Sequence, residues 1–160
     1  MGHAEARKII LERTYRARVE DVWALWTTKG GIESWWGPEG FTTTVLKLDL
    51  RPGGEWRYSM AATAPDIMAW MRNAGRPLAH DVLATYAEIV PLRRLRYTNR
   101  MDFIPGVKSY DAVHLVELHS QGDEVRMVVT LDALHDDTWT QQQRQGFESQ
   151  LGRLTRVLAA

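Results

Sequence analysis

Residues 35–60 read WWGPEGFTTTVLKLDLRPGGEWRYSM, and this stretch decides how the rest of the chain can fold. It predicts the end of a short helix, a strand from Phe41 to Leu50, a tight turn at residues 51–54 and a second strand. Pro52 presets its own φ at about −65°. Gly53-Gly54 can take the positive φ values that a two-residue hairpin connection needs. The stretch therefore predicts an antiparallel hairpin.

One face of this hairpin is expected to be strongly aromatic. Successive side chains of a strand point to opposite faces. In the second strand this rule sets Trp56, Tyr58 and Met60 against Glu55, Arg57 and Ser59. In the first strand it places Val45, Lys47 and Asp49 on one face and Leu46, Leu48 and Leu50 on the other.

The N-terminal part predicts one strand followed by two short helices. Residues 8–16 are rich in β-branched and aromatic side chains, which suits a strand. Apolar residues then recur at helical spacing around Val22 and again around Ile32. Gly30-Gly31 is expected to end the first helix, and Gly37-Pro38 to end the second.

The remainder predicts more strands and a long final helix. Residues 61–78 contain a short helix that begins at Pro65, and we interpret them as an insertion, either a lid or a helix packed on the sheet edge. Strands are expected over 79–90, 92–101, 112–120 and 124–134. His135-Asp136-Asp137 offers acceptors at the start of a helix that runs to about Leu158. Gly146 costs about 1 kcal/mol relative to Ala inside that helix, which suggests that sheet or ligand approaches it closely.

This order of elements indicates an α+β domain whose curved antiparallel sheet, of about seven strands, wraps the C-terminal helix. Trp35-Trp36-Gly37-Pro38 and the segment from Leu50 to Arg57 resemble the signature of the START-like superfamily, also called SRPBCC or Bet v1-like. The resemblance is to its AHSA1-like branch, related to the C-terminal domain of the Hsp90 ATPase activator. Residues 86–98 and 146–151 also resemble family segments, so the likeness spans residues 9–158. It implies a helix-grip fold.

Length and composition fit one domain over residues 1–160. Twenty basic residues balance twenty acidic ones, so no basic face for nucleic acid is expected. The absence of cysteine excludes disulfides and thiolate sites. The polar N-terminus and the lack of an apolar run of about 18 residues predict neither a signal peptide nor a membrane span, and a cytoplasmic protein is expected.

The sequence shows no familiar catalytic motif. His114 and His119 fall on opposite faces of one predicted strand, so they do not chelate a metal together, and neither a metal nor a cofactor is expected. No serine lies in a Gly-x-Ser-x-Gly elbow, and no glycine loop for phosphate follows a strand. The arginines at 93, 94 and 96 form either a solvated edge or an anion site. Acid–base chemistry in an apolar cavity remains, with these candidates: Tyr58, Tyr86, Tyr97, His114 and Glu117.

Three functions stay open. The first hypothesis is a binding module whose cavity, between the sheet and the C-terminal helix, receives a small hydrophobic molecule such as a lipid. The second, implied by some members of the superfamily, is a cyclase, hydratase or isomerase, so whether the chain is an enzyme is left undecided. The third, suggested by the family name, is a chaperone-interacting module, although the chain shows only one START-like domain. Exposed tryptophans would also allow a homodimer.

The side chains expected to line or cover the cavity are large apolar or aromatic residues with a few polar groups among them. They are Trp35, Trp36, Trp56, Tyr58, Met60, Trp70, Met71, Tyr86, Tyr97, His114, Met127 and Phe147.

Overall fold

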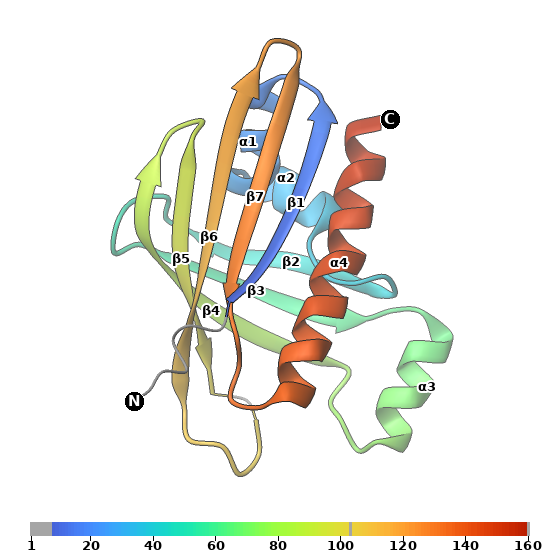
Figure 1. The fold of residues 1–160 in the computed structure, drawn as a ribbon. Helices are drawn as coiled ribbons and strands as arrows, with labels where there is room; N and C mark the ends of the chain where they lie inside the picture. The colour runs from blue at the N-terminus through green and yellow to red at the C-terminus, as the bar shows by residue number, and fades with distance from the viewer. Residues whose placement is uncertain (1–7, 103, 160) are drawn as a thin grey trace.

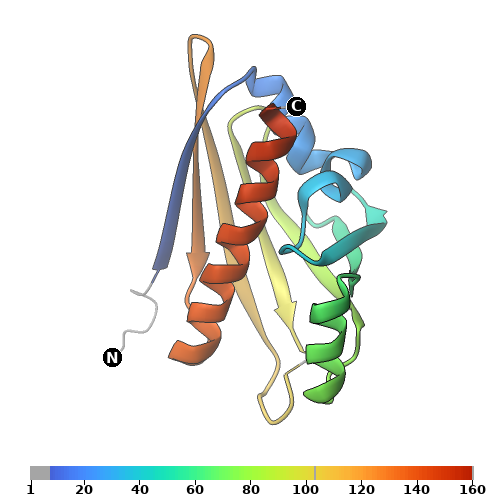
Figure 2. The same ribbon diagram turned by 90° about the vertical axis from the view of Figure 1, so that its right-hand side faces the viewer.

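The computed structural model describes residues 8–102 and 104–159, and it shows a curved antiparallel sheet with a long helix across one face (Figures 1 and 2). The seven strands lie in the order β1-β7-β6-β5-β4-β3-β2. Their bounds are β1 (Lys8–Arg16), β2 (Phe41–Leu48), β3 (Glu55–Ala62), β4 (Ala79–Val90), β5 (Arg94–Met101), β6 (Tyr110–Gln121) and β7 (Glu124–Asp132). The helices are α1 (Val19–Thr27), α2 (Lys29–Trp35), α3 (Pro65–Asn73) and α4 (Asp137–Ala159). The expected α+β helix-grip fold is confirmed.

The face of the sheet that α4 covers is called here the inner face, and the opposite one the outer face. Burial alternates along the central strands, as the period of a half-buried strand requires. In β6, for example, Ala112, His114 and Val116 are buried and their neighbours are partly exposed. The inner face packs against α4 along its length, against α1 and α2 near one end, and lies near α3 at the other (Figure 2).

The junction of the first two helices differs from the prediction. Gly30 and Gly31 do not end α1 but lie inside α2, and Thr28 separates the two helices. The Thr28 hydroxyl accepts a hydrogen bond from the Gly31 N–H at 3.0 Å and so caps α2. A Cβ at Gly31 would come within 2.2 Å of the Ala24 carbonyl oxygen, so glycine permits the close turn between the helices.

The connection between β2 and β3 is longer than the predicted two-residue hairpin. It covers residues 49–54. Within it the Gly54 N–H donates to the Arg51 carbonyl at 2.8 Å, and Gly53 has a φ of +84°, which corresponds to a type II turn with Pro52 at its first corner. The Gly53 N–H donates to the carbonyl of Tyr86 at 2.8 Å, so this loop docks on β4 instead of closing a tight hairpin.

The predicted alternation in β2 also fails beyond Val45. The pairing of β2 with β3 shifts by one residue between Val45 and Lys47, which marks a β-bulge at Leu46. Leu46 is therefore 55% exposed, whereas Val45 is buried and Leu48 packs against the core. In β3 the expected pattern is confirmed for Trp56 and Tyr58, which are both buried.

Helix α4 is fastened to the loop between α2 and β2. The Gln150 side-chain oxygen accepts from the Gly37 N–H at 2.9 Å. One guanidinium nitrogen of Arg153 lies 2.8–3.4 Å from four carbonyl oxygens of residues 36, 37, 38 and 41. These contacts join the two segments that the sequence marked as most characteristic, residues 35–38 and the closing helix.

The predicted close approach to Gly146 by the sheet is wrong. A Cβ built at Gly146 would meet no other described atom within 4 Å, apart from its neighbours and its own helix backbone. Gly146 is half-buried and directly precedes the buried Phe147. Helix α4 therefore has open space on this side.

The interior is divided into two hydrophobic clusters. The larger, called here the main core, joins the inner face to α1, α2 and the middle of α4. The smaller, called the end cluster, contains Met101, Ile104 and Ala112, with Tyr110 and Trp139 packed against it. Within residues 8–102 and 104–159, no helix is long and apolar enough to cross a membrane.

Candidate functional site

Most of the residues expected to line a cavity belong to the main core. Trp36 is at its centre, with ring centroids 5.0 Å from Trp56, 5.1 Å from Trp35 and 5.7 Å from Phe147. These edge-to-face contacts are the geometry that aromatic rings prefer. The expected lining residues buried in this core are Trp35, Trp36, Trp56, Tyr58, Tyr86, Tyr97, Met127 and Phe147.

Three tyrosine hydroxyls come together inside this core. Tyr58, Tyr86 and Tyr97 lie on the neighbouring strands β3, β4 and β5, and Tyr86 is paired directly with Tyr97. Burial raises the pKa of Tyr58 to about 12, although a hydrogen bond from the Trp36 side chain opposes the rise. Burial raises the pKa of Tyr97 well above its usual value, and the nearby Tyr58 and Tyr86 raise it further. All three phenols are therefore neutral at physiological pH.

Several polar atoms of this core have no hydrogen-bond partner among the described residues. They are the hydroxyls of Tyr15 and Tyr86 and the indole nitrogen of Trp56, and the buried side-chain oxygen of Asn99 also has none. The rings of Trp56 and Tyr86 are nearly parallel, at 7°, with centroids 6.2 Å apart. A buried polar group without a partner costs about 1–3 kcal/mol, so this grouping needs an explanation.

His114 lies next to Asn99, at the border between the main core and the end cluster. Its Nδ1 is 3.1 Å from the Tyr97 hydroxyl and 3.3 Å from the Asn99 side-chain nitrogen. Its ring also packs edge-on against Phe147, with centroids 5.8 Å apart. Burial lowers the pKa of His114 to about 4, although a side-chain hydrogen bond to Gln143 and the nearby Asp132 oppose this shift. His114 is therefore neutral at physiological pH.

The other expected lining residues lie toward α3. Met71 is buried, Met60 is half-buried, and Trp70 is 57% exposed. The guanidinium of Arg76 lies 5.4 Å from the ring centre of Trp70 and 5.9 Å from that of Trp139 in α4. Trp70 and Arg76 therefore connect the segment after α3 to the start of the long helix. The tryptophans of α1 and α2 are buried or half-buried, so none of them is largely exposed as Trp70 is.

Glu117, a candidate acid–base group, lies on the outer face. Its carboxylate is 3.4 Å from Arg94, and it alternates with the buried Val116 and Leu118. His119 is exposed and His114 is buried, so the predicted opposite orientation of the two histidines is confirmed. Arg94 and Arg96 both contact Glu88, at 3.5 Å and 3.7 Å, which favours a network of ion pairs over an anion site.

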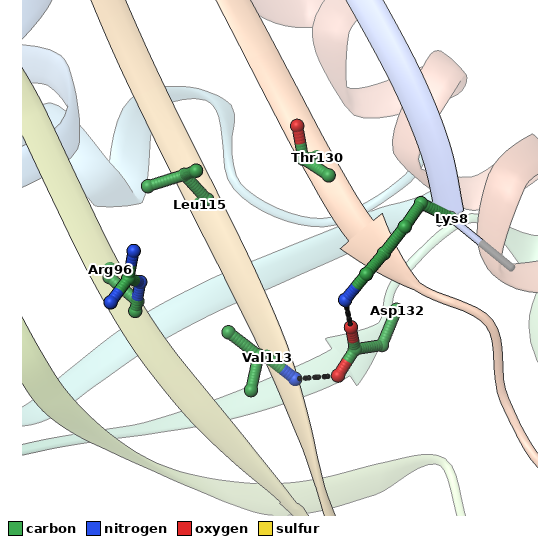
Figure 3. Close-up of a pocket in the computed structure, with 6 residues that line it drawn as sticks. All are labelled: Lys8, Arg96, Val113, Leu115, Thr130 and Asp132. Carbon is green, nitrogen blue, oxygen red and sulfur yellow. Dashed lines mark hydrogen bonds and ion pairs between the residues drawn. The ribbon is translucent and has the colours of Figure 1, made fainter. Parts of the chain in front are cut away.

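The hollows that stand out in the described part of the chain lie away from the buried tyrosines. One of about 400 Å³ is on the outer face, between β5, β6, β7 and β1 (Figure 3). There Asp132 accepts from the Val113 N–H at 2.8 Å and pairs with Lys8. A second hollow of about 300 Å³ adjoins the turn between β4 and β5 and includes Arg93 and Glu117. Both are shallow surface features rather than enclosed cavities.

Sequence reasoning did not single out Asn99 or Gln143. Asn99 is 8% exposed and follows Tyr97 by two residues on β5, so its inward orientation was implied by the strand period. Gln143 is one of several glutamines near the start of α4, and its side-chain nitrogen donates to the carbonyl of Asp132 at 2.9 Å. Helical spacing puts it on the same side as Phe147, four residues later. The strand period for Asn99 and the helical period for Gln143 were therefore the sequence signals that could have indicated these two residues.

Comparison with known proteins gives a consistent family assignment. A model of the family described as activator of Hsp90 ATPase homolog 1-like protein matches residues 16–159. No curated protein matches the chain.

Solved structures with the same fold come from several bacteria. A protein from Chromobacterium violaceum is 24% identical with a TM-score of 0.79, and the match covers 97% of this chain and 99% of that one. The AHSA1 protein from Silicibacter pomeroyi is 19% identical with a TM-score of 0.74, covering 96% and 98% of the two chains. An AHSA1-like protein from Aeromonas hydrophila is 23% identical with a TM-score of 0.72, covering 94% and 90%.

Proposed function

The chain belongs to the activator of Hsp90 ATPase homolog 1-like family, and on that premise we propose that it binds a small, mainly apolar molecule between the inner face and α4. One observation carries the proposal. The Trp56 indole nitrogen and the Tyr86 hydroxyl have no partner among the described residues, although both side chains are at most 1% exposed. A ligand with one polar group would supply the partner that these atoms lack, while its apolar part would contact the surrounding rings.

The position of the polar atoms supports this function. The rings of Trp56 and Tyr86 lie 5.2 Å and 6.4 Å from that of Tyr97, whose hydroxyl contacts His114. Gly146 leaves space beside α4 in the same part of the helix, directly before Phe147. A ligand that reaches Trp56 would adjoin the aromatic packing around Trp36, whose ring centroid lies 5.0 Å from that of Trp56.

Residues 61–78 serve in this proposal as the cover of the site. Met71 is the only fully buried residue described in α3, and Trp70 is largely exposed. The contacts of Arg76 with Trp70 and Trp139 bridge the insertion to α4. Because a single exposed cation–π contact is worth only about 0.5–1 kcal/mol, this bridge adds little to the burial of Met71 in holding the cover closed.

Native mass spectrometry of the gently purified protein, followed by denaturing extraction, tests the function. We expect a reproducible small-molecule adduct on the wild-type protein. The adduct should be reduced in Tyr86→Phe, which removes an unpartnered hydroxyl, and retained in the control Tyr110→Phe, which alters a hydroxyl bonded to His135 in the end cluster. Equal loss of the adduct in both variants would contradict the assigned position, and failure of the protein to bind any small aromatic probe would contradict the function.

A further inference from the structure

The hydrogen bonds around His114 determine which of its nitrogens carries the proton. Nδ1 lies 3.1 Å from the Tyr97 hydroxyl and 3.3 Å from the Asn99 side-chain nitrogen. The Asn99 NH₂ group can only donate, but its nitrogen also lies 3.4 Å from Nε2, so this contact does not distinguish the two ring nitrogens. The contact with Gln143 decides between them.

Gln143 offers the His114 ring a hydrogen-bond acceptor. Its side-chain nitrogen donates to the carbonyl of Asp132 at 2.9 Å, which leaves its side-chain oxygen as the acceptor for His114, with which it is hydrogen-bonded. With the Tyr97 hydroxyl at Nδ1, the ring proton belongs on Nε2, where it donates to the Gln143 oxygen, and Nδ1 accepts from Tyr97. A chain of hydrogen bonds then runs from the β7 backbone through Gln143 and His114 to Tyr97. Gln143 acts as a positioning residue, since it reaches the site only through the histidine.

This position of the His114 proton determines whether the Tyr97 oxygen can donate or accept a hydrogen bond. A phenol has one hydrogen to donate, and Tyr97 gives it to His114 Nδ1. Toward any other group, the Tyr97 oxygen can only accept. The Asn99 side-chain oxygen, which has no partner among the described residues, is a second acceptor near the Tyr97 oxygen.

The interior also carries no formal charge. Among the residues that the structure describes, no Asp, Glu, Lys or Arg is fully buried. A charged ligand group would enter this interior without a counter-charge, which is strongly unfavourable. A neutral group that donates a hydrogen bond fits the two acceptors.

We infer that the site recognises an uncharged hydroxyl of its ligand, an alcohol or a phenol, which donates to the acceptors set up by the Gln143–His114–Tyr97 chain; this inference rests on the proposed binding function. The oxygen of the same hydroxyl can accept from the Trp56 indole N–H, whose ring lies 5.2 Å from that of Tyr97. The ligand is thereby a hydroxyl-bearing, mainly apolar molecule rather than a hydrocarbon, an ether or a carboxylate.

The first experiment measures the tautomer without any ligand. Long-range proton–nitrogen NMR correlation on the ¹⁵N-labelled full chain at pH 7.5 is expected to show His114 protonated on Nε2 alone. Gln143→Leu is expected to give a mixture of tautomers, while Gln142→Leu, at an exposed position one residue earlier, leaves the signal unchanged. A wild-type His114 protonated on Nδ1, or a tautomer unaffected by Gln143→Leu, overturns the chain of hydrogen bonds.

The second experiment compares 2-naphthol with 2-methoxynaphthalene by isothermal titration calorimetry. The two probes share one ring system, but only the naphthol donates a hydrogen bond. We expect wild-type protein to bind the naphthol about tenfold more tightly, because the ether leaves a buried acceptor unpaired. We expect the ratio to shrink in Tyr97→Phe, whose folding is checked by thermal denaturation.

The outcomes separate the two proposals. Equal affinity of wild-type protein for both probes overturns the hydroxyl preference and leaves the binding function standing. Binding of neither probe overturns the binding function and the preference together. Because the wild-type comparison decides between these outcomes, the test remains valid even if Tyr97→Phe does not fold.

Discussion

Tyr86 and Tyr97 are paired residues on adjacent strands, and their hydroxyls have opposite surroundings. The Tyr97 hydroxyl is bonded to His114, whereas the Tyr86 hydroxyl has no partner among the described residues. We therefore expect Tyr97→Phe to lower the free energy of unfolding by about 1–2 kcal/mol, and Tyr86→Phe to leave it unchanged or raise it by up to about 1 kcal/mol. Urea unfolding at pH 7.5 measures both. Equal losses in the two variants would show that the hydroxyl of Tyr86 has a partner within the fold.

Because His114 is buried, we expect the free energy of unfolding to depend on pH. Its pKa in the folded protein is about 4, below the ordinary value of 6.5, because burial disfavours the charged ring. Between pH 6.5 and 4, His114 binds a proton in the unfolded chain but remains neutral in the folded protein. Stability from this group is therefore complete above pH 6.5, declines as the pH falls through this window, and is reduced by about 3 kcal/mol at its lower end.

The matched variant His114→Gln isolates this effect, because both proteins share every other titrating group. We expect the stability difference between wild type and variant, measured by urea unfolding at several values of pH from 7.5 to 4.5, to shift in favour of the variant as the pH falls. A difference that stays constant over the window would mean that His114 has an ordinary pKa in the folded protein.

At the level of whole elements, we expect the contacts of helix α4 with the loop after α2 to contribute to stability, since they fasten that loop. One nitrogen of Arg153 lies within hydrogen-bond distance of four loop carbonyls, whereas Arg156 makes an exposed ion pair with Glu39. We expect Arg153→Met to cost about 2–3 kcal/mol of stability, because buried acceptors lose a charged donor. Arg156→Met should cost less than about 1 kcal/mol. Thermal and urea unfolding compare the two, and similar losses would rule out the anchoring role of Arg153.

The elements that sequence reasoning found correctly are those set by local patterns. The bounds of β1 match the prediction, because a run rich in β-branched and aromatic residues favours a strand without help from distant contacts. β5 begins at Arg94 rather than at residue 92, since the turn before it includes Leu92 at a φ of +68°. The strand ends near β6 and β7 differ from the prediction by about two residues, where pairing across the sheet decides.

The features that sequence reasoning missed depend on distant partners. The loop at 49–54 takes its length from the bond between Gly53 and the Tyr86 carbonyl, which no local pattern contains. The bulge at Leu46 and the position of Gly31 against Ala24 likewise depend on the neighbouring element. For the candidate site, the aromatic supply was visible in the sequence, but Gln143 acquires its role only when α4 packs on β7 beside His114.

At the scale of the whole molecule, stability is distributed unevenly. The main core joins most of the sheet with α1, α2 and α4. Helix α3 contributes Met71 as its only fully buried described residue and leaves Trp70 57% exposed. Regions with few buried apolar contacts open at a lower free energy than the global unfolding transition. The fold therefore combines a cooperative core with a cover that is held weakly.

Hydrogen exchange followed by mass spectrometry tests this distribution. We expect amides of residues 65–73 to exchange orders of magnitude faster than those of β6 and β7, because opening of α3 does not require unfolding of the sheet. Arg76→Ala should speed exchange in α3 by about two- to fivefold, the value of one exposed cation–π contact, and leave β6 and β7 unchanged. Arg72→Ala, at an exposed position within α3, is the matched control. Protection of α3 equal to that of β6 would make it an integral part of the core, and a cover that opens independently would then be excluded.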